Sequence, residues 1–150
     1  EQRRSEGRTE QPAAVVVSRS PDFSSAWRFF NQPLQRWLLA PEPVDQGFDR
    51  WFPLAPTWPE RLQALGAAGI QRLVLLGGAQ LSADLLQADC VDALQLTLVP
   101  QLLGGRFSWL PCTNAPLPAA LAQPGAWQSE GAEDLGDGEW LVRYRRIRSG

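Results

Sequence analysis

Two pairs of adjacent glycines are the residues whose type and spacing first indicate chemistry. Gly77 and Gly78 follow an apolar run at residues 73–76, and Gly104 and Gly105 follow the next apolar run. Glycine lets a ligand approach the backbone closely, and a helix that starts just after it offers unpaired N–H groups and a positive dipole end. The order apolar run, glycine pair, helix is the layout of a seat for a phosphate group, but the local sequence alone favours a plain strand-to-helix turn.

The second glycine pair makes a ligand groove a better interpretation than either pair would alone. Ligands of open α/β sheets bind at the carboxyl ends of the strands, which is where both pairs fall. The local sequence is not G-x-G-x-x-G, and no acidic residue follows at the spacing that a ribose requires. The pattern therefore gives little support to a Rossmann dinucleotide site.

Hydroxyl, basic and acidic groups supply three further candidates. Ser18, Arg19 and Ser20 follow the first apolar run and could hold a phosphate, with a solvated turn as an equal alternative. The basic stripe at residues 143–148 is interpreted as a solvated strand edge. Asp89 and Asp92 flank the start of a strand, and helix-end chemistry is their simpler interpretation.

Composition excludes many kinds of site. The 150 residues contain no His, and all fourteen basic residues are Arg, so His-dependent triads, the P-loop lysine and Schiff-base lysines are excluded. The two cysteines, Cys90 and Cys112, cannot form a Cys-rich zinc site, and two reduced thiols of a cytoplasmic protein are expected. A net charge of −2 gives no electrostatic case for nucleic acid or an anionic membrane. An enzyme of this composition must rely on a cofactor, carboxylates, hydroxyls and arginines.

Alternating strand and helix patterns must position these groups. Strands are predicted at residues 13–18, 36–40, 71–76 and 92–99, and residues 50–56 are extended at most because two prolines interrupt them. Helices are predicted at residues 57–69, which open with the capping box of Thr57 and Glu60, and in the segment that follows Gly78. The pair Asp137-Gly138 indicates a hairpin that ends the chain. This order predicts an α/β domain with a mainly parallel sheet.

The stretch "LVLLGGAQLSADLLQADCVDALQLTLVPQLLGG" at residues 73–105 resembles the RibD C-terminal family of riboflavin-biosynthesis reductases. The family pattern is a strand, Gly-Gly, a small residue and Leu, then L-x-x-x-L-V-D-E-L-x-L-x-x-x-P-x-L-L-G-G. The start "QPAAVVVSRS" and the end "LVRYRR" also look like family strands. The positions that match in the central stretch are Gly77, Gly78, Ala79, Leu81, Val91, Asp92, Leu94, Leu96, Pro100 and residues 102–105.

The resemblance implies a dihydrofolate reductase-like three-layer α/β sandwich, with a mainly parallel central sheet and a C-terminal antiparallel hairpin. It implies a cytoplasmic NADPH-dependent reductase of 5-amino-6-(5-phosphoribosylamino)uracil that forms a homodimer. It also implies that Ser18 and Ser20 approach NADPH and that the Gly77–Gly78 peptide is cis. Carried over by match, the residues that line the cofactor pyrophosphate are Gly77, Gly78, Ala79, Gln80 and Leu81.

The sequence departs from the family pattern in two places. Leu76 stands in the substrate-binding position just before the glycine pair, where the family usually has a substrate-contacting Glu. Nothing matches the family's early S-x-D-G and G-x-x-T motifs, so we expect either a cropped sequence or a shortened relative. The alternatives are a non-catalytic binding or dimerisation domain, a reductase with a changed substrate, and a dihydrofolate reductase-type enzyme on a pteridine.

The expected organisation is a flexible leader at residues 1–10 followed by one reductase domain at residues 11–150, incomplete at its start. The leader is charged and lacks an apolar region, so it is not interpreted as a signal peptide. No apolar run approaches the length of a membrane span. No metal site is predicted.

Overall fold

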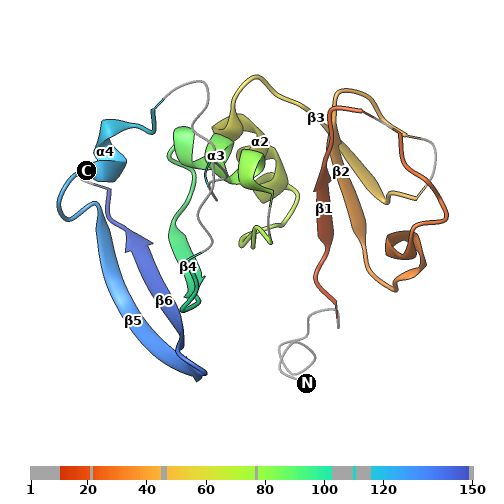
Figure 1. Ribbon diagram of the computed structural model, residues 1–150. Coiled ribbons are helices and arrows are strands. Elements are labelled where there is room, and N and C mark those ends of the chain that lie inside the picture. Colours follow the sequence, from red (N-terminus) through yellow and green to blue (C-terminus); the bar gives the residue numbers. More distant parts are fainter. Residues whose placement is uncertain are drawn as a thin grey trace. The chain divides into compact units, whose positions relative to one another are not determined.

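The computed structural model describes residues 11–20, 22–44, 47–76, 78–102, 110 and 116–148. These residues divide into two compact units, Glu1–Gln71 and Arg72–Gly150, and each unit is described by itself. Figure 1 shows the strands and helices of both. The predicted leader at residues 1–10 lies outside the described residues.

The first unit is built on a parallel sheet of three strands in the order β1-β2-β3. The central strand carries the core of this unit, because Leu38, Leu39 and Ala40 are fully buried. The outer strands are more exposed, since each has only one neighbour in the described sheet. The strands are β1 (Ala14–Val17), β2 (Arg36–Ala40) and β3 (Arg50–Pro53). The predicted strands at residues 13–18 and 36–40 are confirmed, although β1 is half-buried rather than buried on both faces.

An arginine organises the connection between β1 and β2. This connection contains the 3-10 helix η1 (Arg28–Asn31), whose last turn leaves backbone carbonyls without helical partners. The guanidinium of Arg36 donates hydrogen bonds to the carbonyls of Phe29, Phe30 and Gln32. Its charge also lies 5.7 Å from the ring centre of Phe29, within cation–π range. One side chain thus closes the turn that leads into β2.

Helix α2 (Trp58–Ala67) begins and ends where its sequence predicts. The hydroxyl of Thr57 accepts from the backbone N–H of Glu60, and the Glu60 carboxylate accepts from the backbone N–H of Thr57 at 3.1 Å. At the other end Gly69 adopts a φ of +106°, and the N–H of Ile70 bonds the carbonyl of Leu65. This is the Schellman closure, which glycine favours because it has no Cβ.

The second unit contains an antiparallel sheet in the order β4-β6-β5. Asp137 and Gly138 both have positive φ in the turn between β5 and β6, which confirms the predicted hairpin. Its elements are α3 (Ala79–Gln87), β4 (Ala93–Leu98), α4 (Ala119–Ala122), β5 (Trp127–Gly136) and β6 (Glu139–Arg146). None of the described helices is both long and apolar enough to cross a bilayer.

The two faces of this sheet differ in chemistry. One face presents apolar side chains from paired positions, such as Leu96 opposite Val142 and Leu94 opposite Tyr144. The other face carries ion pairs, in which Arg143 contacts Glu133 at 2.8 Å and Arg145 contacts Glu130. This alternation follows from the two-residue repeat of a strand.

Two expectations about strands are wrong. Residues 71–76 form no strand, and Val74 and Leu76 are 80% and 93% exposed. An apolar run becomes a strand only when another strand pairs with it, and no described strand does so here. The basic stripe is not a sheet edge, because β6 lies between β4 and β5, and Arg146 is buried.

We expect Thr57→Ala to lower the free energy of unfolding by about 1 kcal/mol, because the variant loses the hydroxyl that accepts from the start of α2. Chemical denaturation followed by far-UV circular dichroism measures this change. Thr57→Ser is the matched control, since it retains the acceptor oxygen. Equal losses in the two variants would show that the cap does not stabilise the helix.

Candidate functional site

The amino end of α3 has the geometry expected of an anion seat. Gly78 is the N-cap, with φ of +90° and ψ of +94°, and no side chain caps this helix. Its first turn carries no acidic residue, so nothing opposes a bound anion there. The first N–H groups of a helix have no partner within it, and those of Ala79, Gln80 and Leu81 belong to this turn. A side chain at position 78 would be strained by the positive φ, although its Cβ would meet only the Cβ of Leu81, at 3.7 Å.

The serines that follow β1 form a compact turn at the carboxyl end of that strand. The Ser18 hydroxyl donates to the carbonyl of Ser20 and accepts from its N–H at 3.2 Å. The Ser20 hydroxyl accepts from the N–H of Asp22 at 3.4 Å. Ser20 and Arg19 are exposed, so both can reach a ligand from this end of the sheet. These residues belong to the first unit and the α3 turn to the second.

The remaining predicted site residues divide between described and undescribed positions. Leu76 is 93% exposed, and its apolar side chain can neither accept a hydrogen bond nor transfer a proton. Gly77, Gly104, Gly105 and Cys112 lie outside the described residues. The predicted cis peptide between Gly77 and Gly78 therefore stays a prediction.

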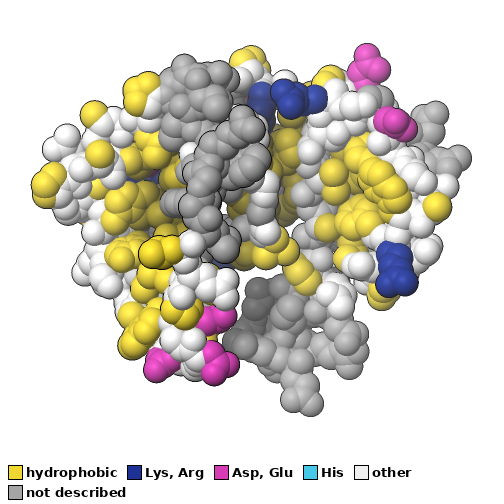
Figure 2. Space-filling model, viewed as in Figure 1, with side chains coloured by type: hydrophobic (Ala, Val, Ile, Leu, Met, Phe, Trp, Pro, Cys, Tyr) yellow, Lys and Arg dark blue, Asp and Glu magenta, His cyan; other side chains and the backbone are white. Residues whose placement is uncertain are grey.

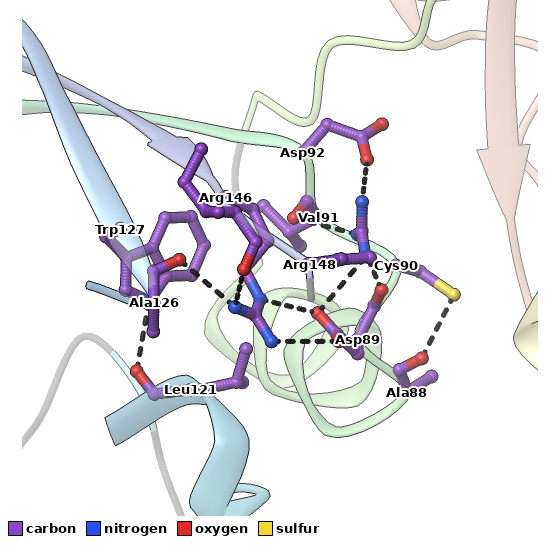
Figure 3. A network of polar contacts seen from close by, with 11 residues as sticks. Ala88, Asp89, Cys90, Val91, Asp92, Leu121, Ala126, Trp127, Arg146 and Arg148 are labelled. Atoms are coloured by element: carbon purple, nitrogen blue, oxygen red, sulfur yellow. Dashed lines mark hydrogen bonds and ion pairs between the residues drawn. The ribbon is translucent and has the colours of Figure 1, made fainter. Parts of the chain in front are cut away.

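Sequence reasoning named Asp89 and Asp92 but missed the arginines that bind them in the polar cluster of the second unit, shown in Figure 3. Asp89 accepts two hydrogen bonds from Arg146, Nε to Oδ1 at 3.0 Å and Nη2 to Oδ2 at 3.1 Å. The Arg146 side chain is 5% exposed and also donates to the carbonyl of Ala126 at 3.1 Å. We call the Asp89–Arg146 pair the latch, because it joins the end of α3 to the end of β6.

Arg148 extends the cluster on its exposed side. It contacts Asp92 at 2.6 Å and donates to the carbonyls of Asp89 and Val91. The interpretation of Asp89 and Asp92 as helix-end and turn residues is confirmed, since arginines occupy both carboxylates. One pattern in the sequence could have indicated these ion pairs: an acidic residue at the end of a predicted helix, with an arginine-rich strand later in the chain.

Three groups in and beside this cluster have shifted pKa values. The hydrogen bond from Arg146 lowers the pKa of Asp89, a shift that burial opposes and the charges of Arg146 and Arg148 assist. Burial raises the pKa of Cys90, whose thiol is free. The hydrogen bond to Asp92 raises the pKa of Arg148. No cluster of acidic and Cys residues in the described part of the chain could hold a metal ion.

The parallel sheet, the antiparallel hairpin and the helix that begins at a glycine define an α/β protein with the dihydrofolate reductase-like fold. A family model of the RibD C-terminal domain matches residues 1–136. The chain therefore belongs to the RibD C-terminal domain family.

A relative and two solved structures agree with this assignment. The riboflavin biosynthesis protein RibD of Haemophilus influenzae is 30% identical over 133 residues, which cover 85% of this chain and 35% of that protein. The diaminohydroxyphosphoribosylaminopyrimidine deaminase/5-amino-6-(5-phosphoribosylamino)uracil reductase of Thermotoga maritima aligns with a TM-score of 0.70 at 16% identity, over 91% of this chain and 38% of its own. A pyrimidine reductase-like protein of Corynebacterium diphtheriae aligns with a TM-score of 0.69 at 19% identity. This alignment covers 99% of this chain and 66% of the other protein. The chain thus spans about a third of the RibD relative.

We expect Asp89→Asn to lower the free energy of unfolding at pH 7 by about 3 kcal/mol, because it leaves the buried Arg146 without a counter-charge. Asn tolerates the positive φ of this position, so the backbone is not the cause of the loss. Asp84→Asn, on the exposed side of α3, is the control for a lost carboxylate. A loss equal to that of the control would show that the latch does not stabilise the unit.

The same pair predicts how stability depends on pH. The pKa of Asp89 is lower in the folded protein than its ordinary value of 3.8, so the unfolded chain binds the proton more readily. The latch contributes fully above about pH 5 and loses its contribution as the pH falls through 3.8 toward the lowered pKa. Denaturation at several pH values should therefore show wild type and Asp89→Asn converging in acid. A constant difference down to the acid limit would contradict the pKa shift.

Proposed function

We propose that this chain is an NADPH-dependent reductase domain of riboflavin biosynthesis, resembling 5-amino-6-(5-phosphoribosylamino)uracil reductase. The observation that carries the proposal is the match of the RibD C-terminal domain family over residues 1–136. The name of the Thermotoga maritima structure includes this reductase activity, which supports the reaction class. The absence of His and Lys is consistent with chemistry supplied by a cofactor.

The start of α3 supports a site for the phosphates of NADPH. The uncapped first turn of α3 presents N–H groups and a positive dipole end, with no carboxylate to repel an anion. We assign Gly78, Ala79, Gln80 and Leu81 to the pyrophosphate, together with Gly77 from the family pattern. The Gln80 amide donates to Asp84 at 2.9 Å, which holds that side chain along the helix surface.

The serine turn supplies a second group of cofactor contacts. Ser18 and Ser20 stand at the carboxyl end of β1, where parallel sheets bind ligands. Ser18 is ordered by its bonds to Ser20, so its hydroxyl needs little further ordering when a ligand binds. Arg19 adds a cation beside them.

When bound, NADPH supplies a hydride to the substrate. The proposed role of the chain is to hold the phosphates, to orient the cofactor and to position a small pyrimidine beside it. Leu76 is the proposed substrate-facing residue, by its place just before the glycine pair. An apolar side chain there provides contact surface and no proton, so any proton that the reaction requires comes from another group.

A non-catalytic binding or dimerisation domain is the second candidate, as is a reductase whose substrate has changed. The observation that favours them is Leu76, which lacks the carboxylate of the family pattern. Saturable cofactor binding without oxidation of NADPH in the presence of the pyrimidine would support the non-catalytic candidate. A homodimer and a cytoplasmic location are further parts of the proposal.

We expect NADPH to quench the tryptophan fluorescence of this chain in a saturable way, because it contains seven tryptophans. Ala79→Asp should raise the dissociation constant of NADPH about tenfold, since a carboxylate in the first turn of α3 repels phosphate. Ala79→Asn is the matched control, with a similar size and no charge. The Asp variant should not destabilise the protein, because acidic residues favour a helix start.

The two outcomes of this titration separate the interpretations. Absence of saturable quenching in the wild-type chain would refute the cofactor proposal. Equal weakening by Ala79→Asp and Ala79→Asn would place the phosphates elsewhere and leave α3 as an ordinary helix.

A further inference from the structure

Trp51 is an exposed tryptophan whose ring is held in place at the carboxyl edge of the parallel sheet. It belongs to β3 and is 39% exposed. Its indole N–H donates to the carbonyl of Ala40, the last residue of β2, at 3.0 Å. Trp51 lies opposite Leu38 in the sheet, so its side chain leans two residues toward the carboxyl end of β2. A tryptophan whose N–H is already bonded offers its ring faces to a ligand.

The serine turn and Trp51 stand on opposite sides of the end of β2. The backbone N–H of Ser18 donates to the carbonyl of Leu39 at 3.0 Å, and Trp51 bonds the next carbonyl, that of Ala40. Neighbouring strands of a sheet lie about 4.8 Å apart, so the ends of β1 and β3 are separated by about 10 Å. This separation is comparable to the length of a nucleoside that carries a phosphate.

The serine turn and Trp51 also share one face of the sheet. The register aligns Val16, Leu38 and Trp51, so their side chains point to the same side. Ser18 comes two residues after Val16 and therefore falls on this face as well. A ligand on this face can contact the hydroxyl and the ring at the same time.

The ring of Trp51 is uncovered, unlike the rings of three other tryptophans. On the opposite face of the sheet, the charge of Arg50 lies 4.8 Å from the ring centre of Trp37. Arginines also lie over Trp58 and Trp127, at 4.7 Å and 5.9 Å. Within the described part of the chain, no ring or cation stacks on Trp51. Figure 2 shows apolar side chains at the surface over β2 and β3, so this part of the first unit offers contact area for a flat ring.

We propose that Trp51 stacks on the adenine ring of NADPH, while the serine turn contacts the polar ribose and phosphate groups of the same nucleotide. This inference rests on the proposed function and adds to it the position of the base. Ser18 and Ser20 supply hydroxyls, and Arg19 is an exposed cation between them, so the charged groups of the nucleotide lie on the β1 side. The uncharged base then lies on the β3 side, where Trp51 stands. Aromatic side chains bind any base in this way, because every base has a π-face.

Isothermal titration calorimetry with NADPH tests the proposal. We expect Trp51→Ala to raise the dissociation constant about tenfold, because the stacking of one base on one aromatic side chain contributes about that factor. Adenosine 2′,5′-bisphosphate, the adenosine half of NADPH, should lose affinity by the same factor, since it carries the whole stacked ring. Trp51→Phe keeps a ring and should bind both compounds nearly as the wild type does. Trp140→Ala removes an exposed tryptophan of the second unit and is the control, which should change neither constant.

The outcomes separate this inference from the function on which it rests. A wild-type chain that binds neither compound would refute both. If the wild type binds NADPH and Trp51→Ala binds it equally well, the proposed function stands and the stacking is wrong. Equal weakening by Trp51→Ala and Trp51→Phe would assign the loss to the hydrogen bond with Ala40 and overturn the inference. A Trp51→Ala variant that binds NADPH normally and the pyrimidine substrate weakly would overturn it as well.

Discussion

The second unit depends on a charge placed where the backbone is strained. Asp89 follows α3 in the left-handed region, with φ of +48°, and the N–H groups of Asp89 and Cys90 bond the carbonyls of Leu86 and Leu85. Glycine is the usual residue at this position of a Schellman closure. An aspartate stands here because its carboxylate forms two hydrogen bonds with Arg146. The strain of the turn is offset by the latch, which links residues 57 positions apart in sequence.

The latch also determines what surrounds it. Arg146 ends β6 and donates to the carbonyl of Ala126, just before β5 begins. The guanidinium lies 5.9 Å from the ring centre of Trp127, whose indole N–H donates to the carbonyl of Leu121 in α4. One buried cation thus connects the end of α3, the start of β5 and the helix between β4 and β5. The amino end of α3, which we assign to the cofactor, belongs to the helix that this cation holds.

Local sequence patterns predicted most helices and strands. They failed where a structure depends on which strands pair with one another. Some features are determined by the residues that form them, so the sequence alone was sufficient to predict them. They are the capping box of Thr57, the glycine after α2 and the Asp137-Gly138 turn. Residues 71–76 carry a strand pattern, but a strand also needs a neighbour, and periodicity says nothing about neighbours. The basic stripe was expected at a sheet edge and lies instead on the central strand β6, because periodicity does not show which strands pair with it. The partner of Arg146 was not predictable, because the two residues approach each other only through the tertiary fold. At the candidate site the sequence located the glycine before α3 and the absent carboxylate at Leu76, while their relation to a ligand rests on the family.

The absence of lysine from these 150 residues, whose basic side chains are all arginine, has a consequence for regulation. Arg36 donates hydrogen bonds to three carbonyls. Arg146 donates to a carboxylate and to carbonyls, and Arg148 donates to a carboxylate and two carbonyls. An ammonium group carries its three donors on a single nitrogen, so it cannot reach several separated acceptors in one plane as a guanidinium group does. Acetylation, which neutralises lysine side chains, has no target side chain in these 150 residues. The contacts that close the turn before β2 and the end of α3 are therefore permanent features of the fold, which lysine acylation cannot switch.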